Sequence, residues 1–200
     1  LEQDDVAAVV AVESHHTVRH GWVRLPELVP LAHEYGVPVI LDGAAQDQRL
    51  AELVEIGCDL VIASAHKFLC STPAGIVAGR KDLVDAVYLQ NRGIGRGMQA
   101  GKEAILGVMA ALEYRMQQPM EDWTAEQDRK VQLILDLLSG APGLVLSVDP
   151  EPNGCPFSRA RLTPDSEQGG LTARQLSDAL GEGDPTVVAR AHHADEGYIY

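Results

Sequence analysis

Two residues at the ends of apolar segments carry side chains that could do chemistry together. Lys67 closes the segment 61–67, which begins as a run typical of a buried strand, and Asp42 closes the segment 37–42 in the same way. A lysine beside an apolar strand is costly unless its charge is paired or its amine is used. The other lysines of the chain lie in polar segments. The pattern therefore predicts a reactive amine at Lys67 and a partner carboxylate at Asp42.

This pair of groups is typical of sites that bind pyridoxal 5'-phosphate (PLP). The lysine amine forms a Schiff base with the cofactor, and once freed it can remove or return the α-proton of an amino-acid substrate. The carboxylate holds a proton on the pyridine nitrogen, which helps the ring to withdraw electrons. We predict that Lys67 is catalytic and that Lys67 and Asp42 bind the cofactor. The alternatives are an exposed lysine after a strand and an ordinary Asp-Gly turn.

Two polar residues precede the lysine in the same turn. The hydroxyl of Ser64 and the imidazole N–H of His66 can both donate hydrogen bonds to a phosphate. Ser64 could equally be a buried hydroxyl that is bonded to the backbone. The residue types alone leave both roles open.

The composition narrows the class of protein. The chain has 200 residues, is 46% hydrophobic and carries a formal net charge of −13. The hydrophobic fraction predicts a packed globular core, whereas the acidic charge makes a nucleic-acid partner unlikely. Three scattered cysteines without CxxC spacing indicate a reducing, cytoplasmic location, and no apolar run is long enough to predict a membrane span. Both ends run into strand-like segments, so we expect a fragment of a longer polypeptide.

Strand-like and helix-like segments alternate in the first half of the chain. The pattern predicts helices at 25–35 and 48–56, and strands at 6–12, 37–41, 59–64 and 72–78. Such alternation indicates βαβ units and a mostly parallel sheet, in which ligands bind beyond the carboxyl ends of the strands. The polar residues that follow these strands are therefore expected to meet at one edge.

The second half has a different pattern. It predicts helices at 102–117, 123–138 and 172–180, and short strands at 144–148, 158–162, 186–189 and 197–200. We predict an α/β fold in which residues 1–100 form part of a cofactor-binding large domain. Residues 101–118 are then a connecting helix, and residues 119–200 a small α+β domain.

The motif residues resemble a known group of enzymes. Residues 42–46 (DGAAQ) followed by 64–67 (SAHK) resemble fold-type I PLP enzymes, particularly class V aminotransferases and cysteine desulfurases. Segments 13–17, 75–83 and 95–103 resemble the selenocysteine-synthase-like family, which includes seryl-tRNA selenium transferases and D-glucosaminate-6-phosphate ammonia-lyase-like enzymes. The resemblance covers nearly the whole chain. It implies the C-terminal part of a fold-type I large domain, with a mostly parallel sheet, followed by a small α+β domain.

The resemblance also implies roles for individual residues. Ser64 and His66 would bind the cofactor phosphate, and Ala44 would pack on the face of the ring. In the family, a glutamine three residues after the aspartate contacts the ring hydroxyl. Ala45 occupies that position here and Gln46 comes one residue later, so Gln46 is kept only as a possible contact to substrate or phosphate.

Three other residues are possible contacts to substrate or phosphate. Arg96 lies in the glycine-arginine segment 91–98, which in related enzymes reaches across a dimer interface. Arg190 could bind the α-carboxylate of the substrate, as arginines of fold-type I small domains often do. His16 could lie above the cofactor. No metal is expected at His15 and His16, because adjacent residues of a strand point to opposite faces.

The implied function is that of a PLP-dependent lyase or transferase acting on a small amino acid or amino sugar acid. The first expectation is α,β-elimination of the ammonia-lyase type. The class V-like lysine turn leaves transamination or cysteine desulfuration open, and seryl-tRNA selenium transfer is a further alternative that the net charge disfavours. A non-catalytic interaction protein is the alternative from another class. The resemblance implies a homodimer or a higher homo-oligomer.

Overall fold

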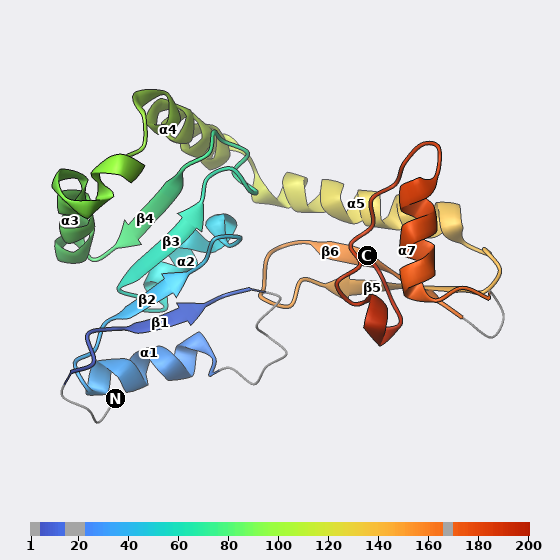
Figure 1. Cartoon of the computed structure of the whole chain (residues 1–200), viewed down its shortest axis with the longest axis horizontal. Coiled ribbons are helices and arrows are strands. Elements are labelled where there is room, and N and C mark those ends of the chain that lie inside the picture. The colour runs from blue at the N-terminus through green and yellow to red at the C-terminus, as the bar shows by residue number, and fades with distance from the viewer. Residues whose placement is uncertain (1–4, 15–22, 166–169) are drawn as a thin grey trace. The chain divides into compact units, whose positions relative to one another are not determined.

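The computed structural model describes residues 5–14, 23–165 and 170–200. The chain forms two compact units, Leu1–Gln118 and Pro119–Tyr200, each of which has its own sheet (Figure 1). The boundary lies between helices α4 (Lys102–Gln117) and α5 (Met120–Leu138), where Pro119 lacks the N–H that would continue the first helix. Helix α4 belongs to the first unit, and a separate role for it as a connecting helix stays a prediction.

The first unit is built on a four-stranded sheet. Its order is β1 (Val9–Val12), β2 (Val39–Asp42), β3 (Leu60–Ser64) and β4 (Gly75–Gly79). Strands β1, β2 and β3 are parallel, whereas β4 runs antiparallel to β3. The structure thus confirms a mostly parallel sheet in an α/β fold.

The connections between the parallel strands are helical. Helix α1 (Leu25–Glu34) lies between β1 and β2 in the chain, and it carries Pro26 in its first turn, where a proline is tolerated. The 3₁₀ helix η2 (Asp47–Arg49) and helix α2 (Leu50–Glu55) lie between β2 and β3. These connections place the polar residues after β2 and β3 on one edge of the sheet.

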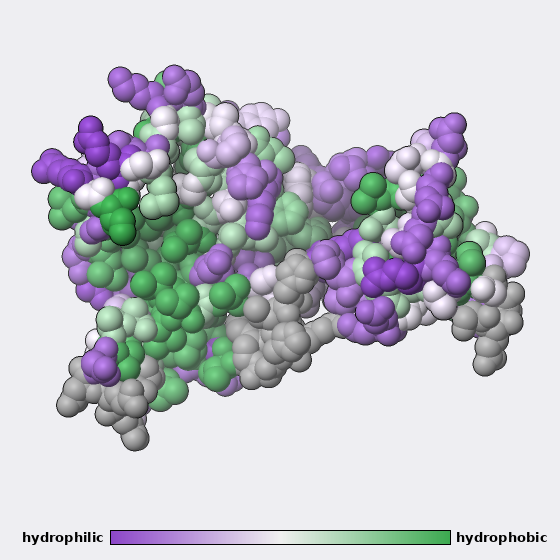
Figure 2. Space-filling view, in the orientation of Figure 1, coloured by the Kyte–Doolittle hydropathy of each residue, from purple (hydrophilic) through white to green (hydrophobic). Residues whose placement is uncertain are grey.

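One face of this sheet is covered and the other is open. The covered face packs against α1 and α2 in a core that contains Ala11, Leu25, Val29, Ala32, Val39, Leu41, Leu53, Cys58 and Val61. Side chains alternate along a strand, so the apolar neighbours of these residues lie on the other face. Val10 is 68% exposed, and Val12 and Ile62 are also exposed. Figure 2 shows the resulting hydrophobic surface over the strands.

The first unit continues beyond the sheet in helical segments. They are α3 (Lys81–Leu89), η3 (Gln90–Arg92), η4 (Ile94–Met98) and α4, and none of them has a buried residue. Their exposed large apolar side chains are Val87, Tyr88, Leu89, Ile94, Met98, Ile105, Leu106, Met109, Tyr114 and Met116. Within the described residues, no helix is both long and apolar enough to cross a membrane.

The second unit is α+β, as predicted. Strands β5 (Leu144–Pro150) and β6 (Ser158–Pro164) form an antiparallel pair, and α5, α7 (Ala173–Glu182) and the 3₁₀ helix η5 (Ala194–Glu196) complete the unit. A small core joins Ala173, Ala194 and Ile199 to the partly buried Leu162, Leu176, Leu180, Ala189 and Ala191.

Two of the strands predicted in this unit are wrong. Residues 186–189 are irregular, because the N–H of Val187 donates to the carbonyl of Leu180 (2.9 Å) at the end of α7 instead of to a strand. Of residues 197–200, only Ile199 makes a bridge, to Leu162.

Candidate active site

The predicted cofactor residues come together at one edge of the first unit's sheet. Asp42 ends β2 and Ser64 ends β3, and the two strands are adjacent and parallel. Asp42 lies opposite Ile62, so β3 extends two residues further before His66 and Lys67 follow in the next turn. This is the carboxyl edge, where open α/β sheets bind ligands.

Hydrogen bonds fix the loop after Asp42 against β3. The N–H of Gly43 donates to the carbonyl of Ile62 (2.9 Å), and the N–H of Ser64 donates to the carbonyl of Ala44 (3.1 Å). The N–H of Ala44 also donates to Oδ1 of Asp42 (3.0 Å). The exposed carboxylate therefore has a set direction relative to β3 and to the turn that follows it.

The lysine lies in a tight turn. The N–H of Cys70 donates to the carbonyl of Lys67 (3.0 Å), and the N–H of Ser71 donates to the carbonyl of Ala65 (2.9 Å). Cys70 has φ +57°, an uncommon value for a residue other than glycine. The side chains of His66 and Lys67 are exposed, so a small molecule can reach the amine and the imidazole from solvent.

These residues fit pyridoxal phosphate by their chemistry. An exposed carboxylate, an accessible amine and two donors for a phosphate lie on neighbouring strand ends. The side chain of Ala44, next to the carboxylate, is small enough to let a flat ring approach. Asp42 and Lys67 would hold the ring, and Ser64 and His66 would hold its phosphate.

A buried polar network adjoins this edge and was missed in the sequence. Nη1 of Arg49 donates to Oε1 of Glu13 (3.4 Å) and to Oε1 of Gln46 (3.2 Å). Its Nε and Nη2 donate to the two carboxylate oxygens of Glu52 (3.0 and 2.7 Å). The hydrogen bond with Glu52 is the main reason that the pKa of Arg49 is raised, although burial lowers it. The spacing of Arg49 and Glu52 was the one local sign of this network.

The network is joined directly to the cofactor loop. The N–H of Glu13 donates to the carbonyl of Asp42 (2.9 Å). Gln46 is 2% exposed, and its Oε1 serves Arg49, so its predicted contact to substrate or phosphate stays a prediction. Arg96 is exposed in η4, and its role is likewise untested. His16 lies outside the described residues.

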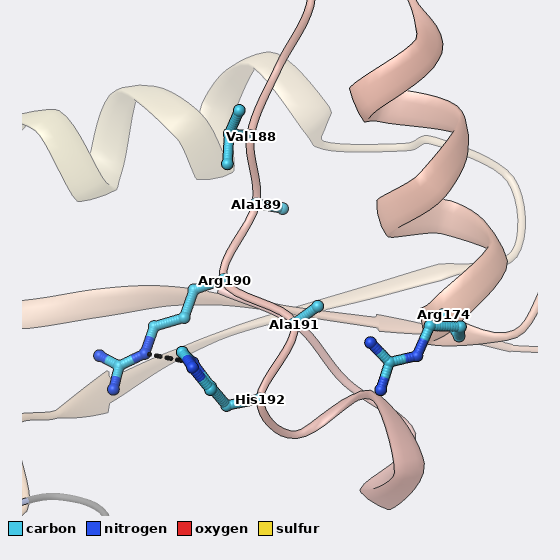
Figure 3. Close-up of a pocket in the computed structure, with 6 residues that line it drawn as sticks. All are labelled: Arg174, Val188, Ala189, Arg190, Ala191 and His192. Atoms are coloured by element: carbon cyan, nitrogen blue, oxygen red, sulfur yellow. Dashed lines mark hydrogen bonds between the residues drawn. The ribbon is translucent and has the colours of Figure 1, made fainter.

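Arg190 belongs to the second unit. It lines a cavity of about 530 Å³ together with Arg174, Val188, Ala189, Ala191 and His192 (Figure 3). Its Nε donates to Nδ1 of His192 (3.3 Å). Burial lowers the pKa of Arg190, and the nearby charge of Arg159 lowers it further. The charges of Tyr200 and Glu151 act in the opposite direction and raise this pKa, although among the described residues Arg190 makes no ion pair with a carboxylate.

Comparison with known proteins finds relatives of nearly twice the length. The chain is 37% identical to 5'-C-glycyluridine monooxygenase-decarboxylase of Streptomyces sp over 185 residues, which are 92% of this chain and 46% of the relative. It is 30% identical to D-glucosaminate-6-phosphate ammonia lyase of Salmonella typhimurium over 194 residues, which are 97% of this chain and 51% of that enzyme. The chain therefore spans about half the length of the curated relatives it matches.

A solved structure and a family model agree with these relatives. The structure of a D-glucosaminate-6-phosphate ammonia-lyase superposes with a TM-score of 0.70 at 29% identity, covering 96% of this chain and 51% of that one. It confirms the fold-type I architecture and the resemblance to this group of enzymes. A sequence model of the class-V aminotransferases matches residues 3–166. The chain therefore belongs to the aminotransferase class-V family, whose members are pyridoxal-phosphate-dependent enzymes, as the residues around Lys67 predicted.

Proposed function

We propose that this chain supplies the cofactor-binding part of an enzyme that eliminates a β-substituent or ammonia from an amino acid or an amino sugar acid. The observation that carries the proposal is the placement of Asp42 at the end of β2 and of Lys67 in the turn after the adjacent strand β3, with the loop after Asp42 hydrogen-bonded to β3. The ammonia lyase from Salmonella typhimurium and the related solved structure support elimination as the first choice.

Each residue has a distinct part in this proposal. When bound, pyridoxal phosphate supplies a sink for the negative charge that develops at the substrate's α-carbon. Asp42 keeps the proton on the pyridine nitrogen, while Ala44 orients the carboxylate and packs on the ring. Lys67 holds the cofactor until the substrate amine displaces it, and its free amine then removes the α-proton. Ser64 and His66 donate to the phosphate.

Arg190 is our candidate for the substrate carboxylate. In an acidic chain, it is a partly buried cation without a carboxylate ion pair among the described residues. Guanidinium groups bind carboxylates through paired hydrogen bonds. The contact of Arg190 to a substrate carboxylate is a proposal, as are the substrate or phosphate contacts of Arg96, Gln46 and His16.

Decarboxylation is the second candidate reaction. The Streptomyces protein, named as a monooxygenase-decarboxylase, has the higher identity of the two relatives, 37% against 30%. Both reactions begin by breaking a bond at the α-carbon. They differ in what is released, so assays for ammonia and for carbon dioxide with the same amino acid separate them. Transamination, desulfuration, selenium transfer and a non-catalytic role remain alternatives, and because none of them releases ammonia or carbon dioxide, the absence of both products would favour these alternatives over elimination and decarboxylation.

The Lys67→Ala variant tests the proposal directly. With added pyridoxal phosphate, the wild-type chain is expected to develop a visible absorbance band and, after borohydride, to gain the cofactor mass on the peptide containing Lys67. The variant is expected to show neither, because its side chain has no amine. Lys81→Ala is the matched control, since Lys81 is an exposed lysine of α3. The absence of an adduct in this chain, and in one extended to the length of its relatives, would overturn the proposal.

We also propose a cytoplasmic homo-oligomer that acts on a small molecule and not on nucleic acid. The exposed Ile105, Leu106 and Met109 on α4 support self-association, because large exposed apolar patches often mark interaction sites. Sedimentation equilibrium is expected to show at least a dimer, and Leu106→Glu is expected to shift it toward the monomer. Glu103→Gln on the same helix is the control. A monomeric wild-type chain at high concentration would contradict the oligomer.

A further inference from the structure

The cavity of the second unit that Arg190 lines is basic. Arg174 of α7 and His192 also line it, and its other described lining residues are apolar (Figure 3). No carboxylate is among these lining residues, although the whole chain carries a formal net charge of −13. A basic cavity in so acidic a chain favours small anions over other small molecules.

The backbone of Arg190 is fixed by Tyr200. The N–H of Arg190 donates to the carbonyl of Tyr200 (2.7 Å), and the N–H of Tyr200 donates to the carbonyl of Arg190 (3.1 Å). Tyr200 is held in turn by both strands of the sheet. Its hydroxyl donates to Oδ2 of Asp149 in β5 (2.8 Å), and the guanidinium of Arg159 in β6 lies 5.4 Å from the centre of its ring. The side chain of Arg190 therefore starts from a fixed position.

The guanidinium of Arg190 is bonded on one flank only. Its Nε donates to Nδ1 of His192 (3.3 Å), and the two terminal NH₂ groups make no hydrogen bond among the described residues (Figure 3). Two N–H groups at the end of a guanidinium match the two oxygens of a carboxylate. Glu151, whose charge acts on Arg190, already pairs with Arg159 (3.3 Å) and accepts from the N–H of Asn153 (2.7 Å). The end of Arg190 is therefore suited to a carboxylate from outside the chain.

Arg174 supplies a second cation to the same cavity. It pairs with Asp195 at 3.4 Å, and the two side chains are 51% and 92% exposed, so this ion pair is weak and an entering anion can replace it. Arg174 lies in the first turn of α7, where Thr172 and Gln175 form a capping box. The positive end of the helix dipole adds to the attraction for an anion there.

We propose that this cavity binds amino acids that carry a second anionic group on the side chain, with Arg190 on the α-carboxylate and Arg174 on the second group. The inference rests on the proposed function only in assigning the α-carboxylate to Arg190. It adds the class of substrate, namely acidic or phosphorylated amino acids. Arg174 is then the residue that distinguishes these amino acids from neutral ones.

Protection of single arginines from phenylglyoxal tests the site in the cofactor-free chain. Phenylglyoxal modifies accessible guanidinium groups, and mass spectrometry of peptides reports each arginine separately. O-phospho-L-serine is compared with L-serine, and L-glutamate with L-glutamine, at constant ionic strength. In at least one pair, the acidic member is expected to protect Arg174 and Arg190 at an about tenfold lower concentration. Arg129, which is exposed on α5, is expected to stay unprotected. Equal protection by the acidic and neutral members of both pairs would overturn the proposal.

The Arg174→Gln variant tests the second cation alone. Glutamine can still form hydrogen bonds but carries no charge, so the acidic amino acid is expected to lose its about tenfold advantage in protecting Arg190. Protection of Arg190 by the neutral amino acid is expected to stay as in the wild type. Arg129→Gln, which removes an exposed arginine from the same unit, is the matched control and is expected to leave the advantage intact. An undiminished advantage in Arg174→Gln would rule out the role of Arg174.

The result does not depend on the cofactor. If an acidic amino acid protects both arginines but Lys67 forms no adduct, even in a chain extended to the length of its relatives, the proposed function fails and the anion site stands. If Lys67 forms the adduct and neither arginine is protected, the proposed function stands and the inferred substrate class is wrong.

Discussion

Replacing Asp59 with alanine is expected to lower the free energy of unfolding of the first unit by about 3 kcal/mol. The buried carboxylate accepts hydrogen bonds from the N–H of Val39 (2.7 Å), Nε2 of His33 (2.8 Å) and Nη1 of Arg80 (2.9 Å). Its removal leaves the N–H of Val39 at the start of β2 without this acceptor. Arg80 is 54% exposed, so its ion pair adds little to the total.

The two units can unfold separately, so the measurement must be local. Hydrogen exchange by mass spectrometry, read on peptides that cover β2 and β3, reports the first unit alone. Asp82→Ala is the matched control, because Asp82 accepts two hydrogen bonds from the same Arg80 but is 62% exposed. Its effect is expected to be much smaller than that of Asp59→Ala, because solvent screens an exposed ion pair. Equal effects of the two substitutions would show that burial and the bond to Val39 do not matter.

The Asp59 carboxylate is also expected to make the stability of the first unit sensitive to acid. Burial by itself would raise the pKa of Asp59, but the hydrogen bonds from Val39, His33 and Arg80 outweigh it and lower the pKa below its ordinary value. The unfolded chain then binds the proton more readily than the folded chain. The contribution of Asp59 is therefore complete above the unfolded pKa, near pH 4, and is lost as the pH falls through the folded pKa. In Asp59→Asn, the free energy of unfolding is expected to fall less steeply as the pH is lowered.

The sheet, and the position of Asp42 and Lys67 at its carboxyl edge, could be predicted because the patterns that indicate them lie within short segments of the sequence. Each strand that leads to Asp42 or Lys67 is a short apolar run with a polar residue at its end, and parallel pairing then brings those ends together. Helix α4 was predicted with its observed bounds, 102–117, since Pro119 marks its end and its residues are good helix formers.

The failures have equally physical causes. Segment 186–189 is rich in β-branched residues, yet its Val187 bonds to the end of α7, and a tertiary contact overrides strand propensity. Helix α3 was not predicted at all. The polar contacts around the site were not predicted because they join residues far apart in the chain. Glu13 and Arg49 are 36 residues apart, and Arg115 donates to the carbonyl of Phe68, 47 residues away. The pattern of a single sequence does not indicate which distant residues will be in contact.

The Arg49→Met variant is expected to destabilise the first unit by about 3–5 kcal/mol. The side chain of Arg49 is 11% exposed and that of Glu13 is 6% exposed, so the substitution takes away the cation that balances a buried carboxylate. Methionine keeps much of the buried volume, which limits the change to charge and hydrogen bonding. Urea titrations followed by hydrogen exchange on β1 and β2 peptides measure the loss.

Arg129→Met is the matched control for this variant. Arg129 makes the same two-oxygen contact, to Glu126, but is 62% exposed on α5, so its replacement is expected to destabilise the protein far less than Arg49→Met does. Adding Glu13→Gln to Arg49→Met is expected to recover more than half of the loss, because no buried charge then lacks its counter-charge. If the double variant is no more stable than Arg49→Met, packing and not charge explains the effect. The N–H of Glu13 donates to the carbonyl of Asp42, directly before Gly43. We therefore expect the amide of Gly43 to exchange faster in Arg49→Met and to regain more than half of its protection in the double variant.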